Sequence, residues 1–316
     1  MAKRAFTFPG QGSQVVEMGK ALGESFAEAR AVYEEVDSAL GRNLSTIMFE
    51  GPDDVLRLTE NAQPALMAVS MAVIRVLETH GVRVGDDVSY VAGHSLGEYS
   101  ALCAAGTFAL ADTARLLDIR GRAMQAAVPV GKGAMAAILG LDLDAVRALA
   151  AEAADGAVCD VANDNAPGQV VVSGTRAAVE RAIEIAKARG AKRAVPLPVS
   201  APFHCSLMAP AAIGMAEALT EVTMHAPAVP LVANVTARPV TDPERIRRHL
   251  IEQVTGMVRW TESITWLAGE GGVDSFFELG TGKVLTGLAK RIAPAAAARA
   301  LGSAEDIKAC LADWNG

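Results

Sequence analysis

Paired cysteines are missing from the sequence. None of the four cysteines belongs to a C-x-x-C pair, and they lie far apart, at Cys103, Cys159, Cys205 and Cys310. This spacing argues against a disulfide framework and against a cysteine-based zinc site. The five histidines also lack metal-ligand spacing, so we expect no metal. Unpaired thiols favour a reducing compartment, and we expect the protein to be cytoplasmic.

Long apolar runs and long blocks of like charge are also missing. No run of about 18 apolar residues occurs, and glycines interrupt the N-terminus before a signal-peptide core could form. The net charge is -7 and charged residues make up 21% of the chain, which argues against non-specific nucleic-acid binding and a disordered tail. We therefore expect neither nucleic acid nor a membrane as a partner, and we expect a monomer.

Hydrophobic residues make up 51% of the 316 residues, enough for a substantial core. Strands are expected at residues 4–8, 87–92 and 229–237 and within 273–282, and a buried helix is expected from Asn61 to Gly81.

From residue 133 the order of elements becomes β-α-β-β-α-β, which is the split-βαβ or ferredoxin-like order. We predict an α/β fold with two parts. A large α/β-hydrolase-like domain with a parallel sheet and a nucleophile elbow comprises residues 1–132 and 200–316. An inserted ferredoxin-like subdomain comprises residues 133–199.

The segment Gly93-His94-Ser95-Leu96-Gly97 matches the pattern G-x-S-x-G. Residues with strand composition precede it and residues with helical composition follow it, so the pattern lies at a strand-to-helix turn. Glycines at both ends allow a sharp turn, and the positive end of the following helix faces the serine hydroxyl. We interpret Ser95 as a candidate nucleophile. The alternative is a tight turn in which Ser95 only caps the helix.

Ser95 needs a proton acceptor, because an unassisted hydroxyl is a poor nucleophile at neutral pH. His204 is the candidate, since it lies in a proline-marked loop before a helix, although a loop histidine taken by itself is more often structural. His94 adjoins Ser95 in an extended segment, so its side chain should point elsewhere. No third, acidic member is assigned, because the aspartates between Ser95 and His204 that could serve fall in the inserted subdomain: Asp142, Asp144, Asp160 and Asp164. A dyad with the imidazole held by a backbone carbonyl is the alternative.

Arg120 falls in the middle of an apolar helix face. On the helical segment 112–127, Leu116, Leu117 and Met124 share that face with it. A guanidinium there cannot shed its charge and must be paired. Two interpretations stay open: a structural salt bridge to an internal carboxylate, and a bidentate clamp on the carboxylate of a substrate.

A series of segments, in order, matches one known family: FPGQGSQ from Phe8, TENAQPAL from Thr59, GHSLGEYSAL from Gly93, RGRAMQ from Arg120, GAMAAILG from Gly133, NAPGQVVVSG from Asn165, PVSAPFHCSLM from Pro198 and FELGTGKVL from Phe277. Through them the chain resembles the malonyl-CoA:acyl-carrier-protein transacylases, acyltransferases that load malonyl units for fatty acid synthesis. The resemblance spans nearly the whole chain.

The resemblance implies a role for each matching residue. Ser95 would be the nucleophile, His204 the base and Arg120 the clamp on the malonyl carboxylate. The backbone N–H groups of Gln11 and Leu96 would form the oxyanion hole.

Four supporting residues are also implied. The main-chain carbonyl of Gln253 would orient the histidine, Asn163 matches an active-site asparagine, and His94 lies beside the nucleophile. Phe203 stands just before the histidine, where related polyketide acyltransferases that take malonyl tend to carry a bulky aromatic. A ring at this position would exclude an α-methyl group, so we expect malonyl to be preferred to methylmalonyl.

The resemblance therefore implies an enzyme, an [acyl-carrier-protein] S-malonyltransferase. It would move malonyl from malonyl-CoA to the phosphopantetheine thiol of acyl carrier protein by ping-pong kinetics, with malonyl-CoA as substrate and no cofactor. The carrier protein is expected to be acidic, so a basic patch should receive it. The candidates are one cluster of Lys187, Arg189, Lys192 and Arg193 and another of Lys283, Lys290 and Arg291.

Three other functions stay open at this point. A serine hydrolase such as a thioesterase would share the elbow and the histidine. An acyltransferase could serve a polyketide pathway instead of fatty acid synthesis. A non-enzymatic carrier-binding domain is the third.

Overall fold

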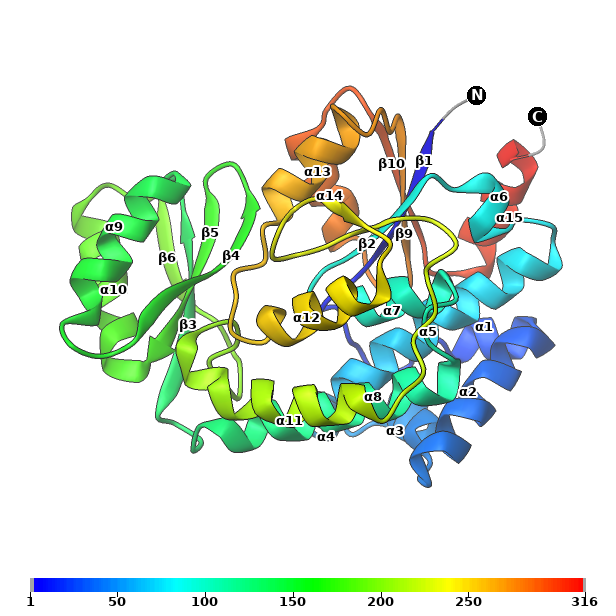
Figure 1. The fold of residues 1–316 in the computed structure, drawn as a ribbon, viewed down its shortest axis with the longest axis horizontal. Helices are drawn as coiled ribbons and strands as arrows, with labels where there is room; N and C mark the ends of the chain where they lie inside the picture. Colours follow the sequence, from blue (N-terminus) through cyan, green and yellow to red (C-terminus); the bar gives the residue numbers. More distant parts are fainter. Residues whose placement is uncertain (1–2, 315–316) are drawn as a thin grey trace.

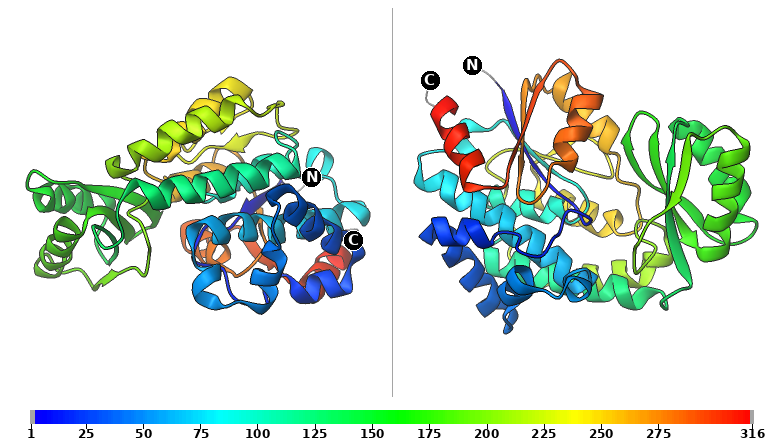
Figure 2. Two further views of the ribbon diagram at one scale, coloured as in Figure 1. Left: turned by 90° about the horizontal axis from the view of Figure 1, so that it is seen from below. Right: turned by 180° about the vertical axis from the view of Figure 1, so that it is seen from behind.

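The computed structural model describes residues 3–314, which form two β-sheets with helices packed on them (Figures 1 and 2). The larger sheet has the strand order β10-β9-β1-β2-β7-β8. Neighbouring strands are parallel except for β7 and β8, which are antiparallel. The strands are β1 (Arg4–Phe8), β2 (Tyr90–Gly93), β7 (Leu231–Val232), β8 (Pro239–Val240), β9 (Ser275–Leu279) and β10 (Ala297–Leu301).

Strands β1, β2 and β9 end at the same edge of this sheet. The register pairs Phe8 with Gly93 and Thr7 with Glu278, so the three carboxyl ends lie side by side. In open α/β sheets, ligands bind outside the carboxyl ends of the strands. The loops that leave this edge are therefore the first place to look for a site.

The segment 229–237 forms less strand than the sequence predicts. Only Leu231 and Val232 are strand β7, and the chain then turns at Ala237, whose φ is 51°, to form the short antiparallel β8. Strand pairing ends before Asn234, because its backbone N–H donates to Glu98 Oε1 at 2.9 Å instead of to a neighbouring strand. The Asn234 side chain bonds to the turn that follows β2.

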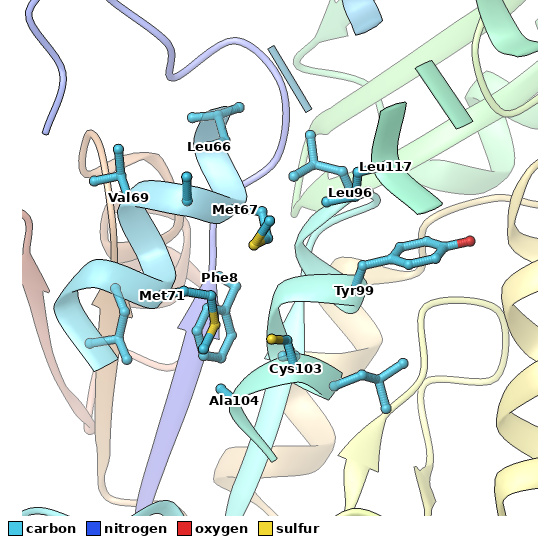
Figure 3. Packing of buried hydrophobic residues seen from close by; sticks show 14 of the residues in the cluster. Phe8, Leu66, Met67, Val69, Met71, Leu96, Tyr99, Cys103, Ala104 and Leu117 are labelled. Atoms are coloured by element: carbon cyan, nitrogen blue, oxygen red, sulfur yellow. The ribbon is translucent and has the colours of Figure 1, made fainter. Parts of the chain in front are cut away.

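The predicted buried helix is α5 (Thr59–Thr79), and every residue from Asn61 to Ile74 is buried. With α7 (Gly97–Ala104) it packs around Phe8 of β1 (Figure 3). The other helices outside the smaller sheet are α1 (Lys20–Ser25), α2 (Ala27–Leu40), α3 (Leu44–Glu50), α4 (Asp53–Leu56), α6 (Val84–Asp87), α8 (Leu110–Ala127), η1 (Ser206–Met208), α11 (Ala209–Thr220), α12 (Pro243–Gln253), α13 (Trp260–Ala268), α14 (Val284–Ile292) and α15 (Ala304–Trp314).

The smaller sheet has the strand order β4-β5-β3-β6, and each neighbouring pair is antiparallel. Helices α9 and α10 pack against it around a separate core that includes Ile138, Leu149 and Val179 (Figure 1). The predicted α/β fold is confirmed: an α/β-hydrolase-like domain with a mostly parallel sheet carries a ferredoxin-like insertion. In chain order the insertion contains β3 (Gly133–Leu139), α9 (Leu143–Ala154), β4 (Cys159–Ala166), β5 (Gln169–Thr175), α10 (Arg176–Ala188) and β6 (Arg193–Pro196).

The two domains contact each other next to the two chain segments that connect them. Helix α8 leads into β3, α11 follows the return from β6, and the two helices lie side by side (Figure 1). Strand β4 also reaches the large domain, because Asn163 bridges Val258 and Asp164 N donates to Val258 O at 2.9 Å. We propose residues 133 and 199 as the limits of the smaller domain on this basis.

Candidate active site

Ser95 lies in the sharp turn between β2 and α7. Its φ of 54° falls in the left-handed region, which residues other than glycine rarely adopt. Only glycine fits at the two flanking positions, because a Cβ atom at either one would clash with the backbone. A Cβ at Gly93 would lie 1.9 Å from the carbonyl carbon of Gly97, and a Cβ at Gly97 would lie 2.2 Å from the oxygen of Phe8. Strand, turn and helix thus have the geometry of a nucleophile elbow.

The Ser95 side chain faces a histidine and an arginine. The N-cap of α7 is Leu96, so Ser95 does not occupy the capping position. Ser95 Oγ lies 2.7 Å from His204 Nε2 and accepts a hydrogen bond from Arg120 Nη2 at 3.1 Å. The hydroxyl therefore contacts a proton acceptor and a cation at once, which the capping interpretation does not explain.

His204 is buried and oriented by backbone carbonyls. Its Nδ1 lies 2.9 Å from Gln253 O and 3.1 Å from Gly256 O, so Nδ1 carries the proton and Nε2 is left as the acceptor for Ser95. Burial, with the nearby Arg120 charge next in importance, lowers the pKa of His204 to about 3. The imidazole is therefore neutral at pH 7 and can take a proton.

The aspartates of the smaller domain bond elsewhere. Asp142 Oδ1 accepts from Ala145 N at 2.8 Å and caps α9. Asp160 Oδ2 accepts from Ser206 N at 2.8 Å. The position that an acid holds in a Ser-His-Asp triad is taken here by the carbonyls at His204 Nδ1, which is a dyad arrangement.

Arg120 is buried, with 1% of its surface exposed, and is held by two glutamines. Its Nη1 donates to Gln63 Oε1 at 2.8 Å, and its Nη2 donates to Gln253 Oε1 at 2.7 Å. In residues 3–314 no ion pair includes Arg120 and its Nε has no hydrogen-bond partner. The structural salt bridge considered from the sequence is therefore not formed.

Gln253 connects the three residues around the hydroxyl. Its carbonyl faces His204, its side-chain Oε1 accepts from Arg120, and its Nε2 donates to Ser95 O at 2.9 Å. Nε2 also donates to the buried carboxylate of Glu98, in the first turn of α7. Sequence reasoning found the Gln253 carbonyl through the resemblance but missed its side chain, Gln63 and Glu98. Glu98 is the one charged residue of the helix after the elbow, and this was the available signal.

The turn leaves one backbone donor open beside Ser95. Asn234 Oδ1 accepts from Ser95 N at 2.8 Å and Asn234 Nδ2 donates to Gly93 O at 2.7 Å, so the Ser95 N–H is occupied. Among the hydrogen bonds of residues 3–314, none uses the N–H of Leu96 or of Gln11. Asn234, which sequence reasoning missed, thus stabilises the elbow, while the N–H groups of Leu96 in the turn and of Gln11 in the neighbouring loop stay without an acceptor in residues 3–314.

These residues open into a cavity of about 350 Å³ between the two domains. Its lining brings together eight of the nine residues singled out from the sequence: Gln11, His94, Ser95, Leu96, Arg120, Asn163, Phe203 and His204. Gln253, the ninth, is fully buried behind them. Asn163 and Met135 come from the smaller domain, so the insertion supplies one wall of the cavity.

His94 and Phe203 line the cavity without contacting the hydroxyl. The ring of His94 bonds to Asn165 Oδ1 at 2.8 Å through Nε2, and burial lowers its pKa. It therefore points away from Ser95, as its extended backbone predicts. Phe203 is 8% exposed and precedes His204 in the chain, so its ring restricts the space next to the imidazole.

Residues 3–314 contain neither a membrane-spanning helix nor a cluster of metal-ligating side chains. None of the helices there has the length and apolar character needed to cross a bilayer. The same residues contain no cluster of three or more histidines, cysteines or acidic side chains suited to a metal ion.

Comparison with known proteins places this geometry in context. The acyl transferase domain family matches residues 5–308. Malonyl CoA-acyl carrier protein transacylase of Escherichia coli K12 is 46% identical over 311 residues, which cover 98% of this chain and 99% of the relative. The protein of the same name from Bacillus subtilis 168 is 46% identical over 293 residues, 92% of this chain and 91% of the relative.

Solved structures give the same result. The acyl-carrier-protein-S-malonyltransferase from Bartonella henselae is 60% identical, with a TM-score of 0.97 over 99% of this chain and 100% of that one. A malonyl-transacylase in complex with a type II PKS acyl-carrier protein is 42% identical, with a TM-score of 0.95 over 99% of this chain and 100% of the solved chain.

Proposed function

The chain belongs to the acyl transferase domain family, and we propose that it transfers malonyl from malonyl-CoA to the phosphopantetheine thiol of an acyl carrier protein. One observation carries the proposal: the Ser95 hydroxyl contacts both a neutral histidine and a buried arginine that has no carboxylate partner in residues 3–314. A nucleophile, a base and a carboxylate-binding cation are thus present in one cavity.

The first half-reaction acylates Ser95. His204 Nε2 takes the hydroxyl proton as Oγ bonds to the thioester carbonyl carbon of malonyl-CoA, and the carbonyl oxygen becomes an oxyanion. The open N–H groups of Gln11 and Leu96 stabilise this oxyanion. The C–S bond then breaks, the imidazolium returns its proton to the thiolate of CoA, and a malonyl ester remains on Ser95.

The second half-reaction repeats these steps with the carrier protein. His204 takes the proton of the phosphopantetheine thiol, sulfur attacks the ester carbonyl, and the tetrahedral intermediate collapses with return of the proton to Ser95 Oγ. The scheme uses malonyl-CoA as substrate and needs no further cofactor.

Arg120 selects a dicarboxylic acyl group. Each of Nη1 and Nη2 has two hydrogens, and Gln63 and Gln253 take one on each nitrogen. The second hydrogen of Nη1 is left, and Nη2 directs its other one at Ser95 Oγ. A malonyl carboxylate can accept from Nη1, and also from Nη2 when it replaces the Ser95 hydroxyl as the acceptor there, while its thioester carbon lies near Ser95. A thioesterase for simple acyl chains would bury this cation without use.

Acidic carrier protein would approach the cavity from the α14 side. Gly282 lies against Ser13, next to Gly12 of the cavity lining, so Lys283 follows a segment that borders this lining. In the other basic cluster, Lys187 pairs with Glu184 and Arg189 with Glu152, which reduces its net charge. We therefore favour the cluster of Lys283, Lys290 and Arg291 as the docking patch.

We place this activity in fatty acid synthesis in the cytoplasm, with a polyketide pathway as the alternative. The four cysteines are free and buried, which fits a reducing compartment. We also propose that the protein is a monomer.

Intact-protein mass spectrometry after brief incubation with malonyl-CoA, acetyl-CoA or methylmalonyl-CoA tests the proposal. We expect a malonyl adduct on the wild-type protein, no adduct on Ser95→Ala, and a much weaker one on Arg120→Ala. Equal labelling by the three donors, or labelling of Ser95→Ala, would contradict it.

A further inference from the structure

We propose that Glu98 is a positioning residue for malonyl selection: through the side chain of Gln253 it fixes the direction of the Arg120 guanidinium. The inference rests on the proposed function, because it concerns the same cavity. It concerns a residue behind the cavity wall, since Glu98 does not line the cavity and is 1% exposed.

The Gln253 amide has two possible orientations, and three contacts agree on one of them. Its Nε2 donates to the Glu98 carboxylate and to Ser95 O at 2.9 Å, while its Oε1 accepts from Arg120 Nη2 at 2.7 Å. In the reversed orientation, Oε1 would face two acceptors and the NH₂ group would face a guanidinium, which only donates. An ionised Glu98 therefore acts with Ser95 O and Arg120 in setting which end of the amide meets Arg120.

Glu98 is itself held firmly. Its second oxygen accepts from Asn234 N at 2.9 Å, and the Asn234 side chain bonds to Ser95 N and Gly93 O. The carboxylate is thus anchored to the elbow on one side and to the Gln253 amide on the other.

The interposed amide has a chemical advantage over a direct ion pair. If Glu98 bonded directly to Arg120, a malonyl carboxylate would have to compete with it for the guanidinium. With Gln253 between them, Arg120 keeps a nearby negative charge and still has hydrogens left for the substrate. Selection of a carboxylate therefore depends on Glu98 although the two never touch.

Burial raises the pKa of Glu98 to about 7, while the bonds from Asn234 and Gln253 and the Arg120 charge oppose this rise. When protonated, Glu98 can donate to Gln253 Oε1 and allow the amide to reverse. The other titratable groups around Glu98 do not gain or lose charge between pH 6 and pH 8. Burial lowers the pKa of His204 to about 3 and also lowers the pKa of His94, and burial raises the pKa of Tyr99 to about 12. Arg120 stays charged.

Glu98→Gln is the variant that tests this, because it keeps the shape of the side chain and removes its charge. The new amide has one accepting oxygen for two donors, so its NH₂ group can bond to Gln253 Oε1 only if the Gln253 amide reverses. We expect the KM for malonyl-CoA in Ser95 acylation to rise roughly tenfold or more, the size of one lost charge-assisted hydrogen bond. Acylation by acetyl-CoA, which has no free carboxylate, should keep its wild-type rate.

Glu278→Gln is the matched control. Glu278 is also 1% exposed and also accepts from backbone N–H groups, but it lies outside the cavity lining. The Glu278→Gln variant should be less stable than the wild type and should show the same ratio of malonyl to acetyl transfer.

The pH profile gives a second readout. As the pH falls from 8 to 6, the malonyl-CoA KM of the wild type should rise and that of Glu98→Gln should stay level. Acetyl-CoA, with the same phosphates, controls for ionisation of CoA.

The outcomes separate the two proposals. A wild-type enzyme without a malonyl adduct on Ser95 would overturn the proposed function whatever Glu98→Gln does. A normal wild type with an unchanged malonyl-to-acetyl ratio in Glu98→Gln, or equal losses with both donors, would overturn the role of Glu98 alone.

Discussion

Two strand-to-helix junctions at the same sheet edge differ in the role of a buried glutamate near the start of the helix. At β9–α14, the Glu278 carboxylate accepts from Leu285 N at 3.1 Å and from Thr286 N at 2.7 Å, so it satisfies the start of the helix. At β2–α7, Glu98 bonds instead to Asn234 and Gln253, and within residues 3–314 the N–H of Leu96 has no acceptor.

The difference separates a structural junction from a chemical one. A helix N-terminus carries unsatisfied N–H groups and a partial positive charge. The β9–α14 junction satisfies them with its own carboxylate and gains stability. The β2–α7 junction leaves the Leu96 N–H without an acceptor in residues 3–314, and this is a donor that we propose for the oxyanion.

The largest difference between the two junctions is expected at Ser95. Ser95→Ala removes the nucleophile, and we expect malonyl transfer to fall roughly 10⁴-fold or more. Thr281→Ala, in the glycine-rich turn of the other junction, should leave transfer unchanged. Steady-state transfer from malonyl-CoA to carrier protein measures both variants, and comparable losses would show that the two turns do not differ as described.

His204, which faces the β2–α7 junction, should also make the folded protein less stable in acid. Because the pKa of His204 is about 3 in the folded chain and about 6.5 when unfolded, only the unfolded chain binds a proton between these values. Stability is therefore lost as the pH falls from about 6.5, by on the order of 3 kcal/mol at pH 4.

His204→Asn should remove this contribution, and asparagine tolerates the left-handed backbone at this position, where φ is 55°. Urea unfolding at pH 7 and pH 4 measures the difference between the two proteins. His225→Gln, at an exposed histidine, is the control and should behave as the wild type. Equal acid sensitivity of His204→Asn and wild type would contradict the prediction.

A substitution at the β9–α14 junction should lower the stability of the protein and leave its acyl selectivity unchanged. Glu278→Ala leaves two buried N–H groups and the Thr286 hydroxyl without their acceptor, and we expect a loss of about 3 kcal/mol. The malonyl-to-acetyl ratio of the folded variant should stay at the wild-type value. Denaturant unfolding and acylation of Ser95 by each donor provide the two measurements, and a change in the ratio would show that the junctions are coupled.

The smallest effect is expected at the surface beside the second junction. Lys283→Glu with Lys290→Glu should raise the KM for the carrier protein roughly fivefold, the size of two exposed ion pairs. The matched reversal of Lys187 and Arg189 should change it less, because those side chains already pair with glutamates. The opposite ranking would move the docking patch to the smaller domain.

Sequence patterns predicted the parts of the site that a single segment determines. Ser95 stands out because two glycines flank it, and Arg120 because it interrupts an apolar helix face. The network behind them joins Gln63, Glu98, Asn234 and Gln253, which lie on separate segments, so only the folded chain shows that they meet.

The fold followed the same rule. Strands with β-branched and aromatic residues, such as β1 and β9, were predicted, and so was the order of the insertion. Strand β10, in the alanine-rich segment Ala297–Leu301, was not predicted, because its composition favours helix and only pairing with β9 makes it a strand.

The carbonyl groups at His204 Nδ1 also suit a base that serves both directions of the proposed reaction. A carboxylate in their place would favour the charged imidazolium, whereas two neutral carbonyls leave a group that takes a proton and gives it back within each half-reaction. The overall reaction begins and ends with a malonyl thioester of the same kind of thiol, and the serine ester lies between them. The enzyme therefore works as an exchanger between two pools, and the relative abundance of loaded and unloaded CoA and carrier decides which way malonyl moves.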